Sequence, residues 1–135
     1  MLDLLKDIHT IRGIERIRLG SLEPTLLTGK FVKEVRNLPK ICRHYHISLQ
    51  SGCDATLKRM NRRYTTEEYR EIVRRLRCAI PEVAVTTDIM VGFPGETEEE
   101  FAATCAFAES MGFSRIHVFP YSPREGTPAA SFEHQ

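Results

Sequence analysis

The strongest constraint on the fold is a long β-branched segment that is followed directly by a helix signal. Residues 83–91 (VAVTTDIMV) are apolar or β-branched at nearly every position, which is typical of a strand buried on both faces. The sequence GFPG at 92–95 breaks this strand, and Thr97 with Glu100 forms a capping-box pattern. Residues 116–119 (IHVF) favour another strand. Together these segments predict a strand–helix–strand unit with a parallel pair of strands.

The same unit occurs twice more towards the N-terminus. Residues 16–19 and 44–49 indicate short strands, and helix patterns follow them at 28–35 and 55–60. A longer amphipathic helix is predicted over 65–80. The chain is therefore expected to adopt an α/β fold with about four parallel strands and helices on the outer face. Since four strands cannot close a barrel, we interpret it as a partial (β/α) TIM-like barrel.

Composition restricts the classes that the chain can belong to. Its 135 residues suit one domain, and 41% of them are hydrophobic, as in ordinary globular proteins. No apolar stretch approaches the roughly 18 residues of a membrane span, and no signal-peptide pattern is present at the N-terminus. We therefore expect a cytoplasmic protein without a membrane partner. The cysteines do not have the spacing of metal-ligand pairs and are expected to be free thiols; they are Cys42, Cys53, Cys78 and Cys105.

Charge is distributed unevenly along the chain. Residues 58–77 contain eight Lys or Arg and three Glu, whereas residues 82–135 contain two Arg and nine acidic residues. The basic segment favours either a solvated helix face or a surface for a polyanion such as RNA. An RNA-binding module without chemistry of its own is therefore one alternative function.

The predicted strand ends are rich in glycine, serine, proline and polar residues. The segments concerned are 20–24, 50–54, 92–96 and 120–124. Ligands of such folds bind at the carboxyl ends of the strands, so these loops predict a rim for a small polar ligand.

A metal site is a second alternative. His44 and His46 lie on the same face of a predicted strand, and Asp88 and His117 belong to neighbouring strands. Such residues bind zinc in metal-dependent hydrolases. Both histidines, however, begin their strand rather than end it, so satisfied structural histidines remain the competing interpretation.

Three segments resemble the radical S-adenosylmethionine methylthiotransferases. They are residues 46–64 (HISLQSGCD…LKRMNRRY), 87–97 (TDIMVGFPGET) and 117–129 (HVFPYSPREGTPA). The last is most similar to the branch that acts on threonylcarbamoyladenosine in tRNA. The resemblance extends from about residue 2 to residue 130.

The resemblance implies a partial (β/α)6 barrel, of which residues 1–135 would cover the third to sixth βα units. The implied full-length enzyme adds a methylthio group to carbon 2 of a modified adenosine next to the tRNA anticodon. Its implied cofactors are S-adenosylmethionine and [4Fe–4S] clusters, and tRNA is its partner. The CxxxCxxC cluster motif does not occur here, so the cluster-binding part and the RNA-binding domain are expected to be absent. This chain alone is expected to be inactive and to hold no metal.

The resemblance also implies part of a cofactor site. Side chains would face the ribose and methionine ends, backbone at 89–92 and 119–121 would flank the adenine, and Asp88 would either contribute or act as a structural acceptor. The implied cofactor-binding residues are Glu23, Gln50, Ser51, Asp88, Ile89, Val91, Gly92, Phe119 and Tyr121. No catalytic residue is assigned. The open barrel edges, near 16–19 and 115–119, are expected to cause self-association.

Overall fold

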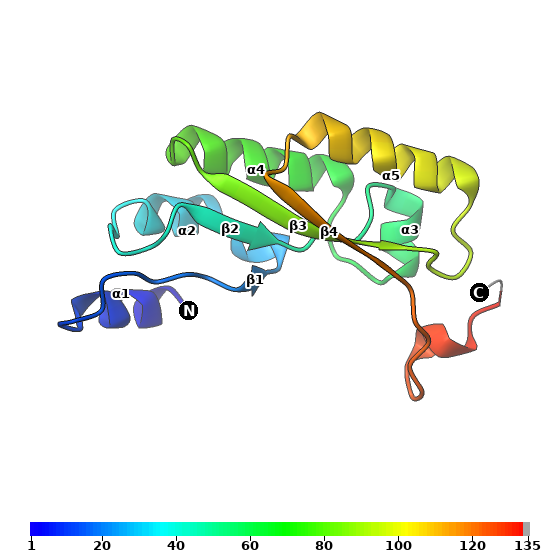
Figure 1. Cartoon of the computed structure of the whole chain (residues 1–135), viewed down its shortest axis with the longest axis horizontal. Helices are drawn as coiled ribbons and strands as arrows, with labels where there is room; N and C mark the ends of the chain where they lie inside the picture. The colour runs from blue at the N-terminus through cyan, green and yellow to red at the C-terminus, as the bar shows by residue number, and fades with distance from the viewer. Residues whose placement is uncertain (134–135) are drawn as a thin grey trace.

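A computed structural model describes residues 1–133 and contains a four-stranded parallel sheet in the order β1-β2-β3-β4 (Figure 1). The predicted four parallel strands are thus confirmed. The strands are β1 (Ser21–Leu22), β2 (His44–Ile47), β3 (Ala84–Val91) and β4 (Arg115–Pro120). The α-helices are α1 (Leu2–Thr10), α2 (Gly29–Val35), α3 (Asp54–Arg59), α4 (Thr66–Ala79) and α5 (Glu98–Met111). Two 3-10 turns cover Pro24–Leu26 and Pro128–Ser131.

The first strand lies later than the sequence predicted. Residues 16–19 form no strand, although Ile17 makes an isolated parallel bridge with Ile41. The strand begins at Ser21, because that residue is in register with His46 on β2. The prediction of a strand at 16–19 was therefore wrong.

The two long helices begin as predicted. Thr65 and Glu68 form a complete capping box at α4, and Thr97 and Glu100 form another at α5. Each box satisfies two backbone amides that a helix start would otherwise leave unpaired. Helix α5 ends at Gly112, whose φ of 56° lies in the left-handed region.

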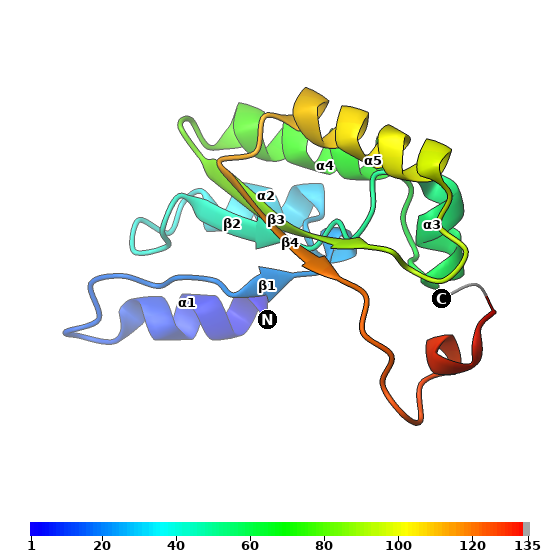
Figure 2. The same cartoon turned by 45° about the vertical axis from the view of Figure 1, so that its right-hand side comes forward.

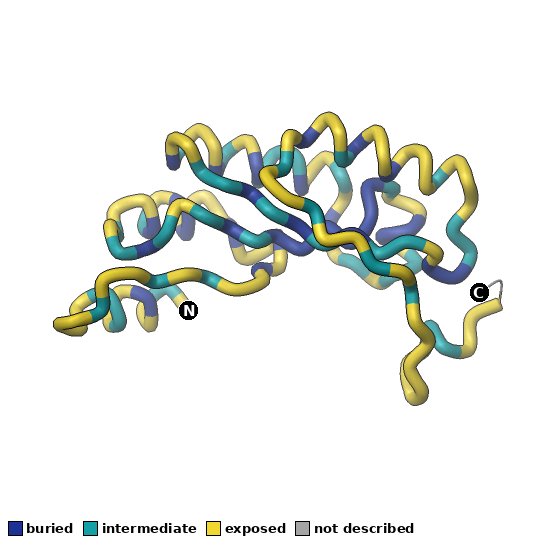
Figure 3. The backbone as a smooth tube through the Cα atoms, viewed as in Figure 1, coloured by how far each residue is buried: buried dark blue, intermediate teal, exposed yellow. Residues whose placement is uncertain are grey.

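The helices cover one face of the sheet. Figure 2 shows α4 and α5 side by side over the strands. Alternate β3 residues, Val85, Thr87 and Ile89, are buried, whereas the residues between them are partly exposed. In Figure 3, buried positions gather on β2, β3 and the helices next to them, whereas β4 stays intermediate or exposed. The helix-covered face is the hydrophobic core, and the opposite face would be the inside of a barrel.

Tyr69 occupies the centre of the core. It is fully buried, and its ring lies edge-on to Phe107 and Phe113 with centroids 6.3 and 6.2 Å away. Its hydroxyl donates a hydrogen bond of 2.8 Å to the Ile47 carbonyl. Burial raises the pKa of this hydroxyl, so it is a neutral donor at any ordinary pH. Tyr69 therefore connects α4 to the end of β2.

The end of β2 contains a β-bulge. His46 pairs with Thr86, but Gln50 bridges to Ile89, so β2 has one residue more than β3 between these two pairs. The carbonyls of Ser48 and Leu49 both accept from the Tyr64 hydroxyl, at 3.0 Å. The Tyr64 hydroxyl thus takes the place of the backbone hydrogen bonds that the bulge interrupts, and it fixes the segment that leads to Gln50.

β4 is an open edge of the described sheet. Its Val118 is 57% exposed, because none of the described helices covers it. Self-association through such edges stays a prediction. Within residues 1–133, no helix is long and apolar enough to cross a membrane.

Candidate functional site

The parallel register aligns side chains in layers across the inner face of the sheet. Towards the amino ends, one layer consists of Ser21, His46, Thr86 and Arg115. The next layer contains Asp88 and His117, and the layer nearest the carboxyl ends contains Met90 and Phe119. The inner face is therefore polar in its lower layers and apolar at its rim.

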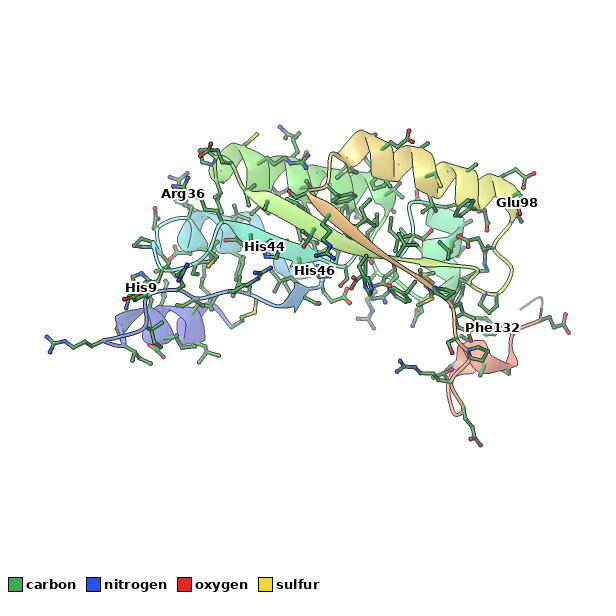
Figure 4. The ribbon with its side chains drawn as sticks, viewed as in Figure 1. His9, Arg36, His44, His46, Glu98 and Phe132 are labelled. Carbon is green, nitrogen blue, oxygen red and sulfur yellow. The ribbon has the colours of Figure 1, made fainter. Side chains whose placement is uncertain are left out.

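Asp88 lies between two imidazoles. One carboxylate oxygen is 3.0 Å from His46 Nε2, and the other is 3.3 Å from His117 Nδ1. The other nitrogen of His46 is 3.0 Å from the Thr86 hydroxyl, which is also 3.1 Å from His44 Nε2. His44, Thr86, His46 and Asp88 thus form a continuous hydrogen-bonded chain over β2 and β3, and His117 on β4 adds a polar contact at its Asp88 end. Figure 4 labels His44 and His46 beside β2.

The surroundings of His44 favour its neutral form. Burial lowers its pKa from the usual 6.5, and the nearby charges of Arg18 and His46 act in the same direction. Its Nδ1 atom is enclosed and has no hydrogen-bond partner among the described residues.

A hollow of about 410 Å³ opens over this layer. Basic groups surround it, from the segment before β1 through to β4, and Asp88 is its single carboxylate; the basic residues are Arg18, His44, His46, Arg115 and His117. The metal hypothesis gains no support here. In residues 1–133, no group of three or more His, Cys, Asp or Glu is placed to hold a metal ion.

A second hollow, of about 270 Å³, lies at the carboxyl ends of β3 and β4. Met90, Phe119 and Tyr121 are among its lining residues. The Tyr121 amide donates to the Val91 carbonyl at 2.8 Å, which extends the pairing of the two strands past their ends. The Tyr121 hydroxyl is enclosed and has no hydrogen-bond partner among the described residues. The segment that encloses this hydroxyl would have to shift before a ligand could accept a hydrogen bond from it.

Aromatic packing orients Tyr121. Its ring lies edge-on to Phe93, with centroids 5.4 Å apart, and Phe93 in turn contacts Phe132 at 6.3 Å. Phe132 is labelled in Figure 4, on the segment that follows β4. The ring of Tyr121 is therefore set before any ligand arrives.

The loops at this rim have left-handed backbone positions. Gln50 has a φ of 70°, and Gly92 has a φ of 69°. A non-glycine residue in this region is strained, and such strain gathers at functional sites. The Gln50 amide and carbonyl still bond to the Asp88 carbonyl and the Met90 amide, both at 2.9 Å. The bulge and the ladder beyond it thus hold Gln50 beside the β3 end of the rim.

The structure does not gather all the predicted site residues. Val91, Gly92, Phe119, Tyr121 and Gln50 lie at the carboxyl ends of β2, β3 and β4. Three other predicted residues, Ile89, Asp88 and Ser51, have side chains that are directed elsewhere. Ile89 is 5% exposed on the helix-covered face, Asp88 contacts His46 and His117 in the layers below the rim, and Ser51 is fully buried.

Ser51 and Glu23 are engaged within the protein. Ser51 Oγ lies 3.1 Å from Thr104 Oγ1 on α5 and accepts from the Cys53 amide at 3.2 Å. Glu23 pairs with Arg62 at 2.8 Å. Ser51 thus serves as a packing contact in this structure, and Glu23 lies at the β1 end of the rim.

The sequence predicted no role for the side chains of Met90 and Arg115, although the backbone at 89–92 was expected to contact the adenine. The available signal was strand alternation: the positions that face inward on β2, β3 and β4 carry His44, His46, Thr86, Asp88, Met90, Arg115, His117 and Phe119. That alternation becomes informative only when the register is known.

Four of the eight basic residues of this segment lie on α4, where acidic residues balance much of their charge. Arg74 and Arg75 both pair with Glu71, at 2.7 and 3.7 Å. Arg70 lies over the Phe107 ring at 4.8 Å, and Arg77 donates to the Gly112 carbonyl. These contacts favour the solvated helix face over an RNA-binding surface.

The cysteines lie apart. Cys42 precedes β2 and Cys53 precedes α3, whereas Cys78 and Cys105 are exposed on α4 and α5. All four are free thiols, and no three of them belong to one element or loop. They do not fit the three-thiolate ligand set of an iron–sulfur cluster.

Comparison with known proteins gives a consistent result. The radical SAM superfamily matches residues 2–108. Threonylcarbamoyladenosine tRNA methylthiotransferase MtaB from Bacillus subtilis (strain 168) is 47% identical over 133 residues, which are 98% of this chain and 30% of MtaB. The chain thus spans about a third of this relative's length.

Two solved structures share the fold. Coproporphyrinogen III oxidase HemN from Escherichia coli, a radical SAM enzyme, has a TM-score of 0.71 at 18% identity, over 91% of this chain and 27% of HemN. The cobalamin-dependent S-adenosylmethionine radical enzyme OxsB has a TM-score of 0.62 at 10% identity, over 78% of this chain and 16% of OxsB.

Proposed function

Because the chain belongs to the radical SAM superfamily, we propose that it forms part of the S-adenosylmethionine-binding barrel of a tRNA methylthiotransferase. The proposed substrate is threonylcarbamoyladenosine next to the anticodon, and the proposed product carries a methylthio group on carbon 2. The observation that carries this proposal is the 47% identity to MtaB over 98% of the chain. A tRNA substrate also agrees with the cytoplasmic location expected from the sequence.

The rim at the carboxyl ends of β3 and β4 fits the nucleoside part of S-adenosylmethionine. Met90 and Phe119 offer apolar contacts to an adenine ring, and the enclosed Tyr121 hydroxyl offers an unused hydrogen bond. Its hollow of about 270 Å³ is small for a whole cofactor, as expected when only part of the rim is present. When bound at a reduced [4Fe–4S] cluster, the cofactor supplies a carbon radical that removes a hydrogen atom from the substrate.

Each rim residue has a proposed part in binding. The Gln50 carboxamide would hydrogen-bond the ribose or the methionine end, and Tyr121 would donate to a ribose hydroxyl. The backbone at 89–92 and 119–121 would contact the edge of the adenine. Glu23 and Asp88 remain proposed contributors at the β1 end and at the floor of the site. The contacts of Ser51 with Thr104 support an indirect role, in which Ser51 holds the loop that contains Gln50.

We propose that the cluster ligands come from outside this chain, since the four cysteines do not fit a cluster. The isolated chain, after anaerobic treatment with iron and sulfide, should hold no stoichiometric [4Fe–4S] cluster. It should also form no 5′-deoxyadenosine from S-adenosylmethionine.

The proposed reaction can be tested with the full-length protein that contains this chain. The purified protein, with its clusters reconstituted, is incubated with S-adenosylmethionine, a reductant and tRNA, and the tRNA is hydrolysed for nucleoside mass spectrometry. A tRNA with threonylcarbamoyladenosine should gain the methylthio group. A matched tRNA whose adenosine carries a neutral, apolar N6 substituent should not gain it. Modification of the second tRNA alone would contradict the proposed substrate.

The proposed cofactor site has its own test. Equilibrium binding of S-adenosylmethionine to the full-length protein is measured for Tyr121→Phe and for Tyr45→Phe, a core tyrosine distant from the rim. Loss of one hydrogen bond should raise the Kd of Tyr121→Phe by about three- to tenfold. The Tyr45→Phe variant should bind like the unmodified protein. Equal affinities of all three proteins would remove Tyr121 from the site.

A further inference from the structure

The hollow over the lower inner face is lined by two cationic side chains, Arg18 and Arg115, and by three histidines. Asp88 is its single carboxylate, and both oxygens of Asp88 already contact imidazoles, at 3.0 Å from His46 and 3.3 Å from His117. Any further anion in this hollow would therefore meet cations and hydrogen-bond donors rather than an unpaired carboxylate.

Arg115 is the least engaged of these cations. It is exposed on β4, lines the hollow, and forms no ion pair or side-chain hydrogen bond with any of residues 1–133. Among the described residues, Arg18, at the opposite end of the hollow, has a single side-chain contact, of 3.4 Å to His44 Nε2. By contrast, most arginines of α4 already contact an acidic side chain, a carbonyl or an aromatic ring. The two guanidinium groups thus make the hollow a site for an anion.

The hollow lies on the same strand as the proposed cofactor rim, nearer the amino end. Phe119 follows Arg115 by four residues on the same strand, and both face inward. A strand rises about 3.3 Å per residue, so their Cα atoms are about 13 Å apart. The Arg115 side chain can span much of this distance. A substrate adenine held inside the rim, on the side of the cofactor's adenine that faces the hollow, could thus direct a substituent of about 5 Å from its N6 atom towards the guanidinium.

The proposed substrate carries a suitable group. Its N6 substituent, a threonylcarbamoyl group, ends in a carboxylate. Arginine binds carboxylates with two parallel hydrogen bonds, and it leaves an unpaired charge when a neutral group takes their place. A polar site of this kind rejects an analogue that lacks the matching group.

We infer that this hollow recognises the carboxylate on the N6 substituent of the modified adenosine, and that Arg115 is the residue that binds it. The inference rests on the proposed function, and it identifies the residue of the same barrel that distinguishes the modified adenosine from one without the carboxylate. His117 lies one layer nearer the rim, and Asp88 orients its ring. Arg18 contributes positive charge from the opposite wall of the hollow.

The test uses the full-length protein with Arg115→Gln, Arg115→Lys and a control, Arg36→Gln. Arg36 follows α2 and is labelled in Figure 4, away from the inner face, so the control removes the same charge elsewhere. Binding is measured for a tRNA with threonylcarbamoyladenosine and for the same tRNA with unmodified adenosine. Binding alone requires no cluster chemistry, so a failure of the proposed reaction would not obscure the result.

Arg115→Gln should weaken binding of the modified tRNA by about tenfold or more, and Arg115→Lys should restore part of this loss. Binding of the unmodified tRNA should stay within about twofold, and Arg36→Gln should change neither. An equal loss for both tRNAs would indicate a backbone phosphate contact and would overturn the inference. An unchanged preference for the modified tRNA would overturn it as well. If the unmodified protein prefers the modified tRNA but never methylthiolates it, the proposed function fails while the inference stands.

Discussion

Ser51 Oγ lies 3.1 Å from Thr104 Oγ1, a contact that ties the loop after β2 to the middle of α5. The Gly52 amide donates to the same threonine oxygen at 3.1 Å. A Cβ atom on Gly52 would come within 2.7 Å of Phe107 Cβ, so the backbone approaches the helix too closely for a side chain. Residues 51–52, which belong to a segment that resembles the methylthiotransferases, are therefore packed against α5, and this packing positions Gln50.

Weakening the packing of residues 51–52 against α5 should reduce the stability of the protein and leave the cofactor contacts intact. We expect Ser51→Ala to lower the free energy of unfolding by about 1 to 2 kcal/mol, because it removes the acceptor of the Cys53 amide. Gly52→Ala should cost more, through the close contact with α5. Urea denaturation measures both effects, and equilibrium binding measures S-adenosylmethionine affinity in the full-length protein. A loss of affinity by Ser51→Ala without a loss of stability would instead place its hydroxyl in the cofactor site.

The Tyr69 hydroxyl should contribute measurably to stability. It donates a hydrogen bond of 2.8 Å to the Ile47 carbonyl inside the core. Tyr69→Phe would remove this hydrogen bond from the buried carbonyl. We expect a loss of about 1 to 2 kcal/mol in the free energy of unfolding. Tyr45→Phe is the control, because Tyr45 is buried just as deeply but its hydroxyl forms no hydrogen bond with any of residues 1–133. Equal losses for the two variants would contradict a role for the hydroxyl at the bulge.

Stability should decline as the pH falls below the usual histidine pKa. The lowered pKa of His44 means that the unfolded chain takes up a proton at a pH where the folded chain does not. Between the lowered pKa and 6.5, unfolding is therefore favoured as the pH decreases. His44→Gln should flatten this dependence, which denaturation at a series of pH values can measure. Identical slopes for both proteins would contradict the assignment. The carboxylates with lowered pKa, such as Glu100, act below 4.5 and so outside this window.

Charge reversal on α4 should affect tRNA binding only weakly. Arg74 and Arg75 both pair with Glu71, so its carboxylate already neutralises part of their positive charge. In the full-length protein, Arg74→Glu with Arg75→Glu should change tRNA affinity by less than about threefold, with an unchanged salt dependence. A large loss of affinity, with a shallower salt dependence, would restore the RNA-binding interpretation of this helix.

Features encoded by neighbouring residues were predictable from the sequence. The capping boxes at Thr65 and Thr97 involve residues three positions apart, and both helices begin where they were predicted. Residues 83–91 have the composition of a buried strand, and β3 covers all but the first of them. In these cases the local signal and the final fold agree.

Features that depend on distant partners were not predictable. β1 begins at Ser21 because that residue pairs with His46, which is 25 positions away. The role of Ser51 depends on Thr104, and neither residue indicates the other in the sequence. The bulge before Gln50 is defined by a change in register against β3. The anion-binding site that we propose near Arg115 likewise becomes visible only when the strands are aligned.

We propose that the protein containing this chain methylthiolates threonylcarbamoyladenosine in tRNA. The most direct measurement is nucleoside mass spectrometry of tRNA from cells that lack the gene, with and without a plasmid copy. We expect the 2-methylthio derivative of threonylcarbamoyladenosine to be absent from the mutant and restored by the plasmid, with the unmethylthiolated nucleoside changing in the opposite direction. An unchanged amount of the methylthio derivative in the mutant, or a loss confined to a different nucleoside, would contradict the account.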